Sequence, residues 1–114
     1  FHGLWNGQGK GDSEDRLAQS ENIVSFLKTL NHSFILGGDF NLSPDTQSLR
    51  MLEDCGLRNL IKEYGVTSTR TALYAKENRY ADYVLVSKGV NVEDFQVLPD
   101  EVSDHAPLCV KISA

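Results

Sequence analysis

The sequence has few cysteines and no long apolar segment. Its two cysteines, Cys55 and Cys109, lie far apart and belong to no CxxC pair. Neither a disulfide scaffold nor a zinc ribbon is therefore encoded, and a reducing compartment, the cytoplasm, is the expected location. A transmembrane helix needs about 20 predominantly apolar residues, and a signal peptide needs a basic and then an apolar segment at its start. The sequence shows neither pattern.

Positive charge is also scarce. The chain has 11 basic and 16 acidic residues, a formal net charge of −5. Proteins that hold nucleic acid through many phosphate contacts normally present a basic face, so tight non-specific binding is not expected. An enzyme that meets one phosphate at a time remains compatible, because a metal ion can supply the missing positive charge. A length of 114 residues with 40% hydrophobic residues is suited to one domain with its own core.

Helical patterns occur in the first half of the sequence, and strands dominate the second half. Apolar residues recur at helical spacing from 15 to 30, which predicts an amphipathic helix. Ser43–Pro44 is typical of an N-cap followed by proline, which predicts a second helix from 43 to 55, closed by Gly56. Segment 57–64 fits either a helix or a strand, and 67–71 either a loop or an edge strand. Strands are predicted at residues 1–4, 34–37, 81–87, 92–98 and 108–112.

Two short polar motifs lie beside predicted strands. Residues 38–41 (Gly-Asp-Phe-Asn) follow the strand at 34–37, and residues 103–107 (Ser-Asp-His-Ala-Pro) precede the last strand. Sheets often carry functional groups on the loops at their strand ends. Each motif alone also fits ordinary turn chemistry, because glycine, aspartate, asparagine and serine are frequent turn residues. The occurrence of both motifs in one chain favours a functional site.

The residue types in these motifs suit the hydrolysis of a phosphoester. That reaction needs a water molecule that is deprotonated and aimed at phosphorus, and donors for the charge that grows on the phosphoryl oxygens. Asp39 can orient or deprotonate the water, and Asn41, two residues later, can donate to a phosphoryl oxygen. An imidazole such as His105 can bind phosphate as a cation or pass a proton. Ser103, Asp104 and His105 cannot form a Ser–His–Asp triad, because adjacent residues cannot converge as its geometry requires.

With a third motif, these residues resemble the endonuclease/exonuclease/phosphatase superfamily, the DNase I-like metal-dependent phosphoesterases. Residues 79–87 (RYADYVLVS) are similar to the Asp-Tyr strand of that family, and the three motifs agree with it in order and spacing. The resemblance covers essentially the whole chain, residues 1–114, but only as the C-terminal half of the family's domain. It implies half of a four-layer αββα sandwich, with a mainly antiparallel sheet and helices on its outer face. Because the family's first metal-binding glutamate lies in the N-terminal half, the chain is expected to be part of a longer domain.

The resemblance also implies an activity and a set of site residues. It implies a Mg²⁺- or Mn²⁺-dependent phosphodiesterase, such as a nuclease, or a phosphomonoesterase, in which water attacks phosphorus directly. Asp82 is implied to orient His105, His2 to contact the phosphate or assist the leaving group, and Asp39 and Asp104 to bind the metal. The implied substrates are phosphoesters such as nucleic acids, phospholipids or sugar phosphates. The expected catalytic residues are His2, Asp39, Asn41, Asp82 and His105.

Other interpretations stay open. The chain can instead be a catalytically inactive structural or phosphate-binding half that forms a homodimer through the exposed face of its sheet, since uncovered apolar surface tends to be buried by association. Asp82 and His2 also fit ordinary exposed polar residues. A zinc site is disfavoured, because it would need scattered histidines and cysteines to converge. The glycine-rich segment 7–11 lacks the spacing of nucleotide-binding loops. Two interpretations fit Trp5, Lys10 and Arg16, contact with a substrate or a position on a flexible surface loop, and the loop is the expected one.

Overall fold

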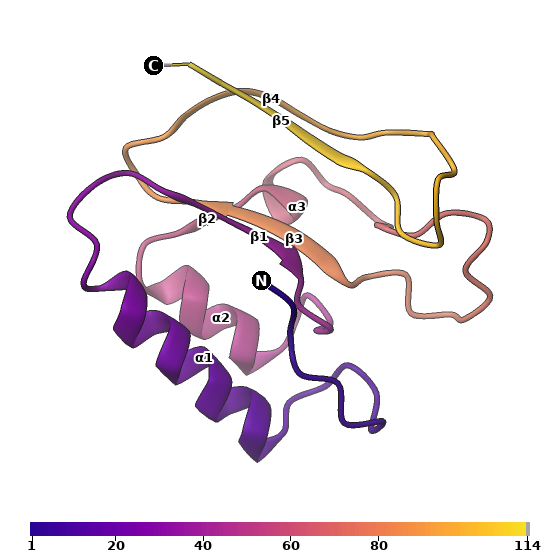
Figure 1. The fold of residues 1–114 in the computed structure, drawn as a ribbon, viewed down its shortest axis with the longest axis horizontal. Coiled ribbons are helices and arrows are strands. Elements are labelled where there is room, and N and C mark those ends of the chain that lie inside the picture. The colour runs from indigo at the N-terminus through magenta and orange to yellow at the C-terminus, as the bar shows by residue number, and fades with distance from the viewer. Residues whose placement is uncertain (114) are drawn as a thin grey trace.

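The computed structural model describes residues 1–113 and has a mixed α/β fold (Figure 1). Helices occur in the first part of the chain, and the last part is all strand, as the sequence predicts. The elements in chain order are α1 (Glu14–Leu27), β1 (Ile35–Asp39), α2 (Gln47–Asp54), β2 (Arg58–Asn59), α3 (Leu60–Glu63), β3 (Asp82–Val86), β4 (Asn91–Val97) and β5 (Leu108–Ser113). Within the described residues, no helix has the length and apolar character needed to cross a membrane.

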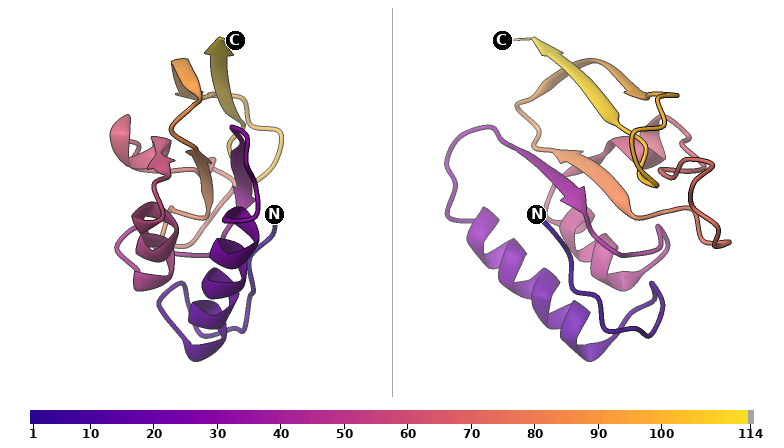
Figure 2. Two further views of the ribbon diagram at one scale, coloured as in Figure 1. Left: turned by 90° about the vertical axis from the view of Figure 1, so that its left-hand side faces the viewer. Right: turned by 45° about the vertical axis from the view of Figure 1, so that its right-hand side comes forward.

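The strands form two separate antiparallel sheets. One sheet has the order β1-β3-β2, and the other is the pair β4-β5. Figures 1 and 2 show α1 and α2 on one side of the β1-β3 pair, whereas β4 and β5 lie on the far side from them. The expected antiparallel arrangement with helices on an outer face is therefore present, with its strands divided between two sheets.

The hydrophobic core lies between β3 and the helices. Tyr83 and Leu85 of β3 are fully buried, and they belong to the same buried cluster as Leu49 and Leu52 of α2. Phe95 of β4 joins this cluster from the second sheet. Strand β3 is buried along most of its length, which agrees with its run of β-branched and aromatic residues. Strand β3, which carries the expected site residue Asp82, is thus also the most buried strand.

Helix α1 is shorter than predicted and ends at Leu27. Its N-cap is Ser13, whose hydroxyl oxygen accepts a hydrogen bond from the Arg16 amide. At the other end, the amides of Thr29 and Leu30 bond to carbonyls only three residues back, at 2.9 and 3.1 Å. These tighter bonds close the helix in a turn before the predicted boundary at residue 30.

The predicted start of the second helix at Ser43–Pro44 is wrong. Helix α2 begins at Gln47, and the hydroxyl oxygen of its N-cap, Thr46, accepts from the Leu49 amide. The two amides before it donate to the carboxylate of Asp12, Gln47 at 2.9 Å and Ser48 at 2.8 Å. The local N-cap Thr46 and the distant Asp12 therefore share the first amides of α2, and local capping rules do not foresee the contribution of Asp12. Gly56, with φ +100°, follows the C-cap as predicted.

Neither of the two segments that the sequence left ambiguous forms a single helix or strand. Segment 57–64 contains both a strand and a helix, β2 followed by α3. Segment 67–71 is irregular, with one isolated bridge between Arg70 and His105. The predicted strand at 1–4 is reduced to a single bridge between His2 and Asp39. Strand β1 runs two residues further than predicted, so Asp39 is its last residue.

Candidate functional site

Two aspartates face each other where β1 ends and β3 begins. Asp39 is the last residue of β1 and is paired with Asp82, the first residue of β3. Residues directly opposite each other in an antiparallel pair point to the same face, so the strand register alone brings the two carboxylates together. Both side chains are largely buried, at 16% and 13% exposure. A buried pair of acids needs donors or a cation nearby.

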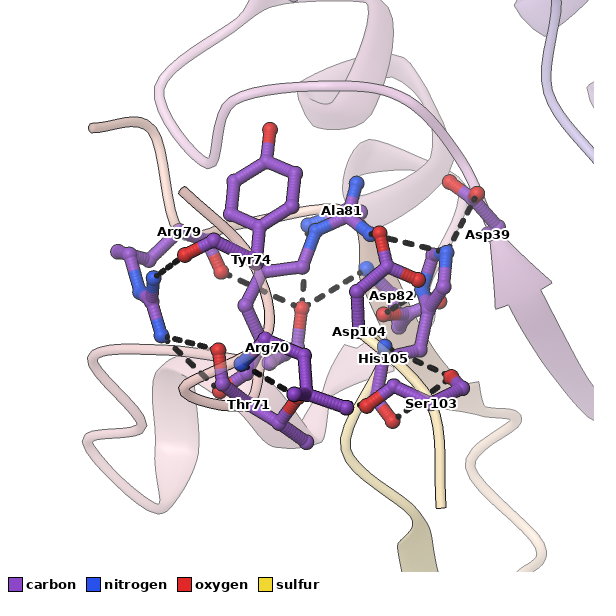
Figure 3. Close-up of polar contacts among 12 residues, drawn as sticks. Asp39, Arg70, Thr71, Tyr74, Arg79, Ala81, Asp82, Ser103, Asp104 and His105 are labelled. Atoms are coloured by element: carbon purple, nitrogen blue, oxygen red, sulfur yellow. Dashed lines mark hydrogen bonds and ion pairs between the residues drawn. The ribbon is translucent and has the colours of Figure 1, made fainter. Parts of the chain in front are cut away.

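His105 supplies a donor to this pair (Figure 3). Its Nδ1 lies 2.8 and 3.1 Å from the two carboxylate oxygens of Asp82, and its Nε2 lies 3.6 Å from Oδ2 of Asp39. Because Asp82 is the acceptor, Nδ1 carries the proton in this pair. The loop before β5 positions the ring: the His105 amide donates to Ser103 Oγ at 2.9 Å, and the Ala106 amide to the Thr69 carbonyl at 2.9 Å.

Asn41 is held beside Asp39 by its backbone and by its side chain. It is the only non-glycine with a positive φ among the described residues, at +53°, a conformation that asparagine tolerates better than most residues. Its amide donates to Asp39 Oδ1 at 3.0 Å, and its Nδ2 donates to the Gly3 carbonyl at 2.9 Å. An asparagine Nδ2 has two hydrogens, so one donor remains for another acceptor.

The N-terminal segment reaches the same place. The Gly3 amide donates to the Asp39 carbonyl at 2.6 Å, and the neighbouring His2 places Nε2 at 3.7 Å from Asp39 Oδ2. Unlike the other groups, the His2 side chain is mostly exposed, at 73%. The structure therefore brings His2, Asp39, Asn41, Asp82 and His105 together from four separate segments of the chain.

Asp104 lies at the edge of this group. Its side chain is half exposed, and Oδ2 is 3.5 Å from Nη1 of Arg70. The metal-ligating atoms that converge most tightly belong instead to Asp39, Asp82 and His105, all within 4.8 Å of one another. Asp82 is already bound to His105 in that cluster.

Carboxylate oxygens are the ligands that Mg²⁺ and Mn²⁺ prefer. Asp39 and Asp104 are the carboxylates of the group that are not bound to His105 Nδ1, so this chemistry fits a divalent cation. Their assignment as metal ligands stays a prediction.

A cavity of about 330 Å³ lies beside this group, and His2, Asn41, Asp104 and His105 line it, whereas Asp39 and Asp82 do not. Its wall includes three residues that the sequence analysis did not single out, Arg70, Tyr74 and Lys76. They come from an irregular polar segment whose composition indicates only a loop, so no local signal marked them. The complete lining is His2, Trp5, Lys10, Asn41, Arg70, Tyr74, Lys76, Asp104 and His105.

The expectation that Lys10 and Arg16 lie on a flexible surface loop is wrong. Lys10 is buried, and its Nζ donates to the carbonyls of Tyr80 and, at 3.3 Å, Asn78. Burial, and next the positive charge of Arg70, lower the pKa of Lys10. Arg16 is also buried and donates to the Gly11 carbonyl at 2.7 Å. Both long side chains tie the glycine-rich segment to the body of the protein.

The sequence matches the model of the Endonuclease/Exonuclease/phosphatase family over residues 4–105. The chain belongs to this family. The matched range contains the motifs at 38–41 and 79–87 and the first three residues of the motif at 103–107. These three segments meet at the site. No curated protein matches the sequence significantly.

Two solved structures share the fold. One is the mannosyl-6-phosphatase Bt3783 of Bacteroides thetaiotaomicron VPI-5482, with a TM-score of 0.73 and 22% identity, over 90% of this chain and 47% of that protein. The other is an endonuclease/exonuclease/phosphatase family protein from Bacteroides thetaiotaomicron, with a TM-score of 0.73 and 23% identity, over 89% of this chain and 46% of that protein. The chain thus spans about half the length of the family structures that it resembles.

Proposed function

We propose that this chain carries the catalytic residues of a divalent-metal-dependent phosphoesterase, in which water attacks phosphorus directly. The observation that carries the proposal is the approach of Asp39 to the Asp82–His105 pair, with His105 Nε2 3.6 Å from Asp39 Oδ2. A base for water thereby lies next to His105, a donor for phosphate that lines the cavity. Membership of a family of hydrolytic phosphoesterases supports the same reaction class.

The residues divide the work of hydrolysis between them. Asp39 accepts a proton from the attacking water or orients it, because its carboxylate lies 3.6 Å from Nε2 of His105, which lines the cavity. His105 presents Nε2 to the phosphoryl group and, when protonated there, donates to a phosphoryl oxygen, while Asp82 stabilises the imidazolium. The spare Nδ2 hydrogen of Asn41 donates to a second oxygen, and His2 assists the leaving group from the exposed side.

A divalent cation fits beside these residues as Mg²⁺ or Mn²⁺. Asp39 and Asp104 would hold it through carboxylate oxygens, the ligand type that both ions prefer. When bound, such an ion polarises the phosphoryl group and neutralises its charge. This is the contribution that a chain with a net charge of −5 most lacks.

The substrate is a phosphoester, and three classes are candidates: nucleic acid, phospholipid and sugar phosphate. The name of one structural neighbour, mannosyl-6-phosphatase, makes a sugar phosphate the first of these to test. The acidic balance of the chain favours a small substrate over a long polyanion.

The test is the hydrolysis of 4-nitrophenyl phosphate and bis(4-nitrophenyl) phosphate with Mg²⁺ or Mn²⁺, and with EDTA. Wild-type activity is expected to require the metal and to be lost in Asp39→Ala. Asp100→Ala, which removes an exposed carboxylate from a loop outside the site, is the matched control and should retain activity. Activity that survives in Asp39→Ala, or that is unaffected by EDTA, would contradict the proposal.

The second candidate is a non-catalytic half that self-associates. Ile35 of β1 and Ile112 of β5 are large, exposed apolar side chains, at 43% and 46%, that line one hollow between the two sheets. Such a patch favours association through that face. Sedimentation velocity distinguishes the two candidates: a dimer without metal-dependent hydrolysis supports the second, and an active monomer excludes it.

A further inference from the structure

Arg70 has an unusual position for a residue of a polar loop. Its side chain is only 7% exposed, and its guanidinium forms part of the wall of the 330 Å³ cavity. Nη1 lies 2.9 Å from His105 Nε2 and 3.5 Å from Asp104 Oδ2. Figure 3 shows the guanidinium beside the ring of Tyr74 and extended toward Asp104 and His105. Arg70 therefore contacts the proposed catalytic histidine on the ring nitrogen opposite to Asp82.

The protein leaves this guanidinium incompletely bonded. An arginine head group has five N–H donors, yet both of the side-chain hydrogen bonds that Arg70 makes with the described residues use Nη1. Its Nε is buried without a hydrogen-bond partner among residues 1–113. A buried charged donor without an acceptor is costly, so the arrangement is poorly explained by a structural role alone. Nη2 makes no hydrogen bond with the described residues and is not among their buried unpaired atoms, so it is free to donate to an anion in the cavity.

Further cations surround the same place. The guanidinium carbon of Arg70 lies 3.9 Å from the centre of the Tyr74 ring, and Lys10 Nζ lies 5.3 Å from it. Lys76 adds a third cation to the cavity wall. Burial, and next the positive charge of Arg70, lower the pKa of Lys10. The lining of the cavity thus carries three cations, Lys10, Arg70 and Lys76, and one carboxylate, Asp104, although Asp39 and Asp82 lie close by. This excess of cations in the lining suits an anionic ligand.

We propose that Arg70 is a substrate-binding residue that receives the terminal phosphoryl group of a phosphomonoester, held on the Tyr74 ring for that purpose. This inference rests on the proposed phosphoesterase function and narrows its substrate class. The guanidinium fork matches two oxygens of one phosphoryl group. A monoester has a third oxygen free of ester bonds for His105 and a cation, whereas a diester has only two such oxygens in all.

The distances agree with a shared ligand. Because Nη1 is 2.9 Å from His105 Nε2, an oxygen that accepts from Arg70 lies within reach of His105 as well. A volume of about 330 Å³ is at the small end of ligand pockets, which suits a phosphorylated small molecule.

The test measures binding without catalysis. Isothermal titration calorimetry in EDTA with inorganic phosphate, methyl phosphate and dimethyl phosphate compares the wild type with Arg70→Gln and Arg70→Lys. The wild type should bind phosphate and methyl phosphate, and bind dimethyl phosphate at least about tenfold more weakly. Arg70→Gln should weaken phosphate binding at least about tenfold, and Arg70→Lys should restore it only in part, because lysine lacks the planar fork. Arg50→Gln, an exposed arginine on α2, is the matched control and should bind as the wild type does.

Several results would overturn this inference. They are a wild type that does not bind phosphate, dimethyl phosphate that binds as tightly as methyl phosphate, and Arg70→Gln with unchanged affinity. Thermal unfolding establishes that each variant is folded. If Arg70→Gln does not fold, Tyr74→Leu removes the supporting ring and should weaken phosphate binding while Arg70 remains. Since no metal or turnover is involved, loss of hydrolysis in the Asp39 experiment and loss of binding here are independent outcomes.

Discussion

His105 Nδ1 donates a hydrogen bond to Asp82 at 2.8 Å, although the two residues are 23 positions apart in the sequence. Asp82 begins β3, and His105 lies on the loop before β5, so this bond links one sheet to the loop that leads into the other. It orients the imidazole so that Nε2 faces the cavity, Asp39 and Arg70. The role proposed for His105 depends on this orientation.

Asp82→Asn tests that dependence. An asparagine has nearly the shape of the aspartate, but it lacks the negative charge that stabilises an imidazolium. Its NH₂ group is a donor and replaces one of the two oxygens that accept from His105 Nδ1. We expect kcat for 4-nitrophenyl phosphate to fall by about 10²- to 10⁴-fold, with a small change in KM. Asp94→Asn, on the two-stranded sheet, is the control and should leave kcat unchanged. Equal kcat values for Asp82→Asn and the wild type would refute a positioning role for Asp82.

Gly3→Ala tests how closely the N-terminal segment packs on the site. A Cβ on Gly3 would clash with the Phe40 carbonyl oxygen, so the backbone must move. This movement weakens the bond from the Gly3 amide to the Asp39 carbonyl and the bond from Asn41 Nδ2 to the Gly3 carbonyl. We expect the free energy of unfolding to fall by about 1–3 kcal/mol, measured by urea denaturation. Gly11→Ala meets no atom within 4 Å and should change stability by no more than about 0.5 kcal/mol. Similar stabilities for the two variants would argue against this packing.

Tyr83→Phe removes the hydrogen bond that anchors the loop after Asn41. The Tyr83 hydroxyl donates to the Leu42 carbonyl at 2.7 Å in the buried core. Its loss leaves a buried carbonyl unpaired and should cost about 1–3 kcal/mol of unfolding free energy.

This cost should be the same from pH 5 to about pH 9, because burial raises the pKa of Tyr83 far above its ordinary value of about 10 and keeps the phenol neutral. Tyr64→Phe, at an exposed tyrosine, should have little effect. A cost that appears only at alkaline pH would show that the hydroxyl ionises in the folded protein.

Asp12 should make stability depend on pH. Burial alone would raise the pKa of Asp12, but hydrogen bonds from Ser48 and Gln47 outweigh that effect and lower it. The unfolded chain then binds more protons than the folded chain between the two pKa values, so the contribution of Asp12 is full above the unfolded pKa of about 3.9. It disappears as the pH falls through the lower folded pKa.

Asp12→Asn should therefore cost about 0.5–2 kcal/mol at pH 7, the usual value of a helix cap, and progressively less below pH 4. Urea denaturation at several pH values measures the difference. The control is Asp100→Asn, an exposed aspartate outside the helices and strands. Asp15 is unsuitable because it lies in the first turn of α1. A cost that is independent of pH would show that the carboxylate charge at Asp12 contributes nothing.

The sequence by itself determined the family and the positions of the strands in the second half, because strand residues have a distinctive local composition. The motifs that contain Asp39 and His105 lie beside strands, and their resemblance to the family implied the antiparallel sheet and the residues that meet at the strand ends. Local rules failed at α2, whose first amides are satisfied by Asp12 from a distant segment instead of by the Ser43–Pro44 pair.

Only the tertiary structure decided which loop residues join the site. Arg70 and Lys10 stand in polar, glycine-rich or threonine-rich surroundings that indicate exposure, yet both are buried beside Tyr74. Burial of a charged side chain depends on acceptors and rings that come from other parts of the chain, such as the Tyr80 carbonyl for Lys10. Contacts of that kind have no periodicity in the sequence, so they arise only when the chain has folded.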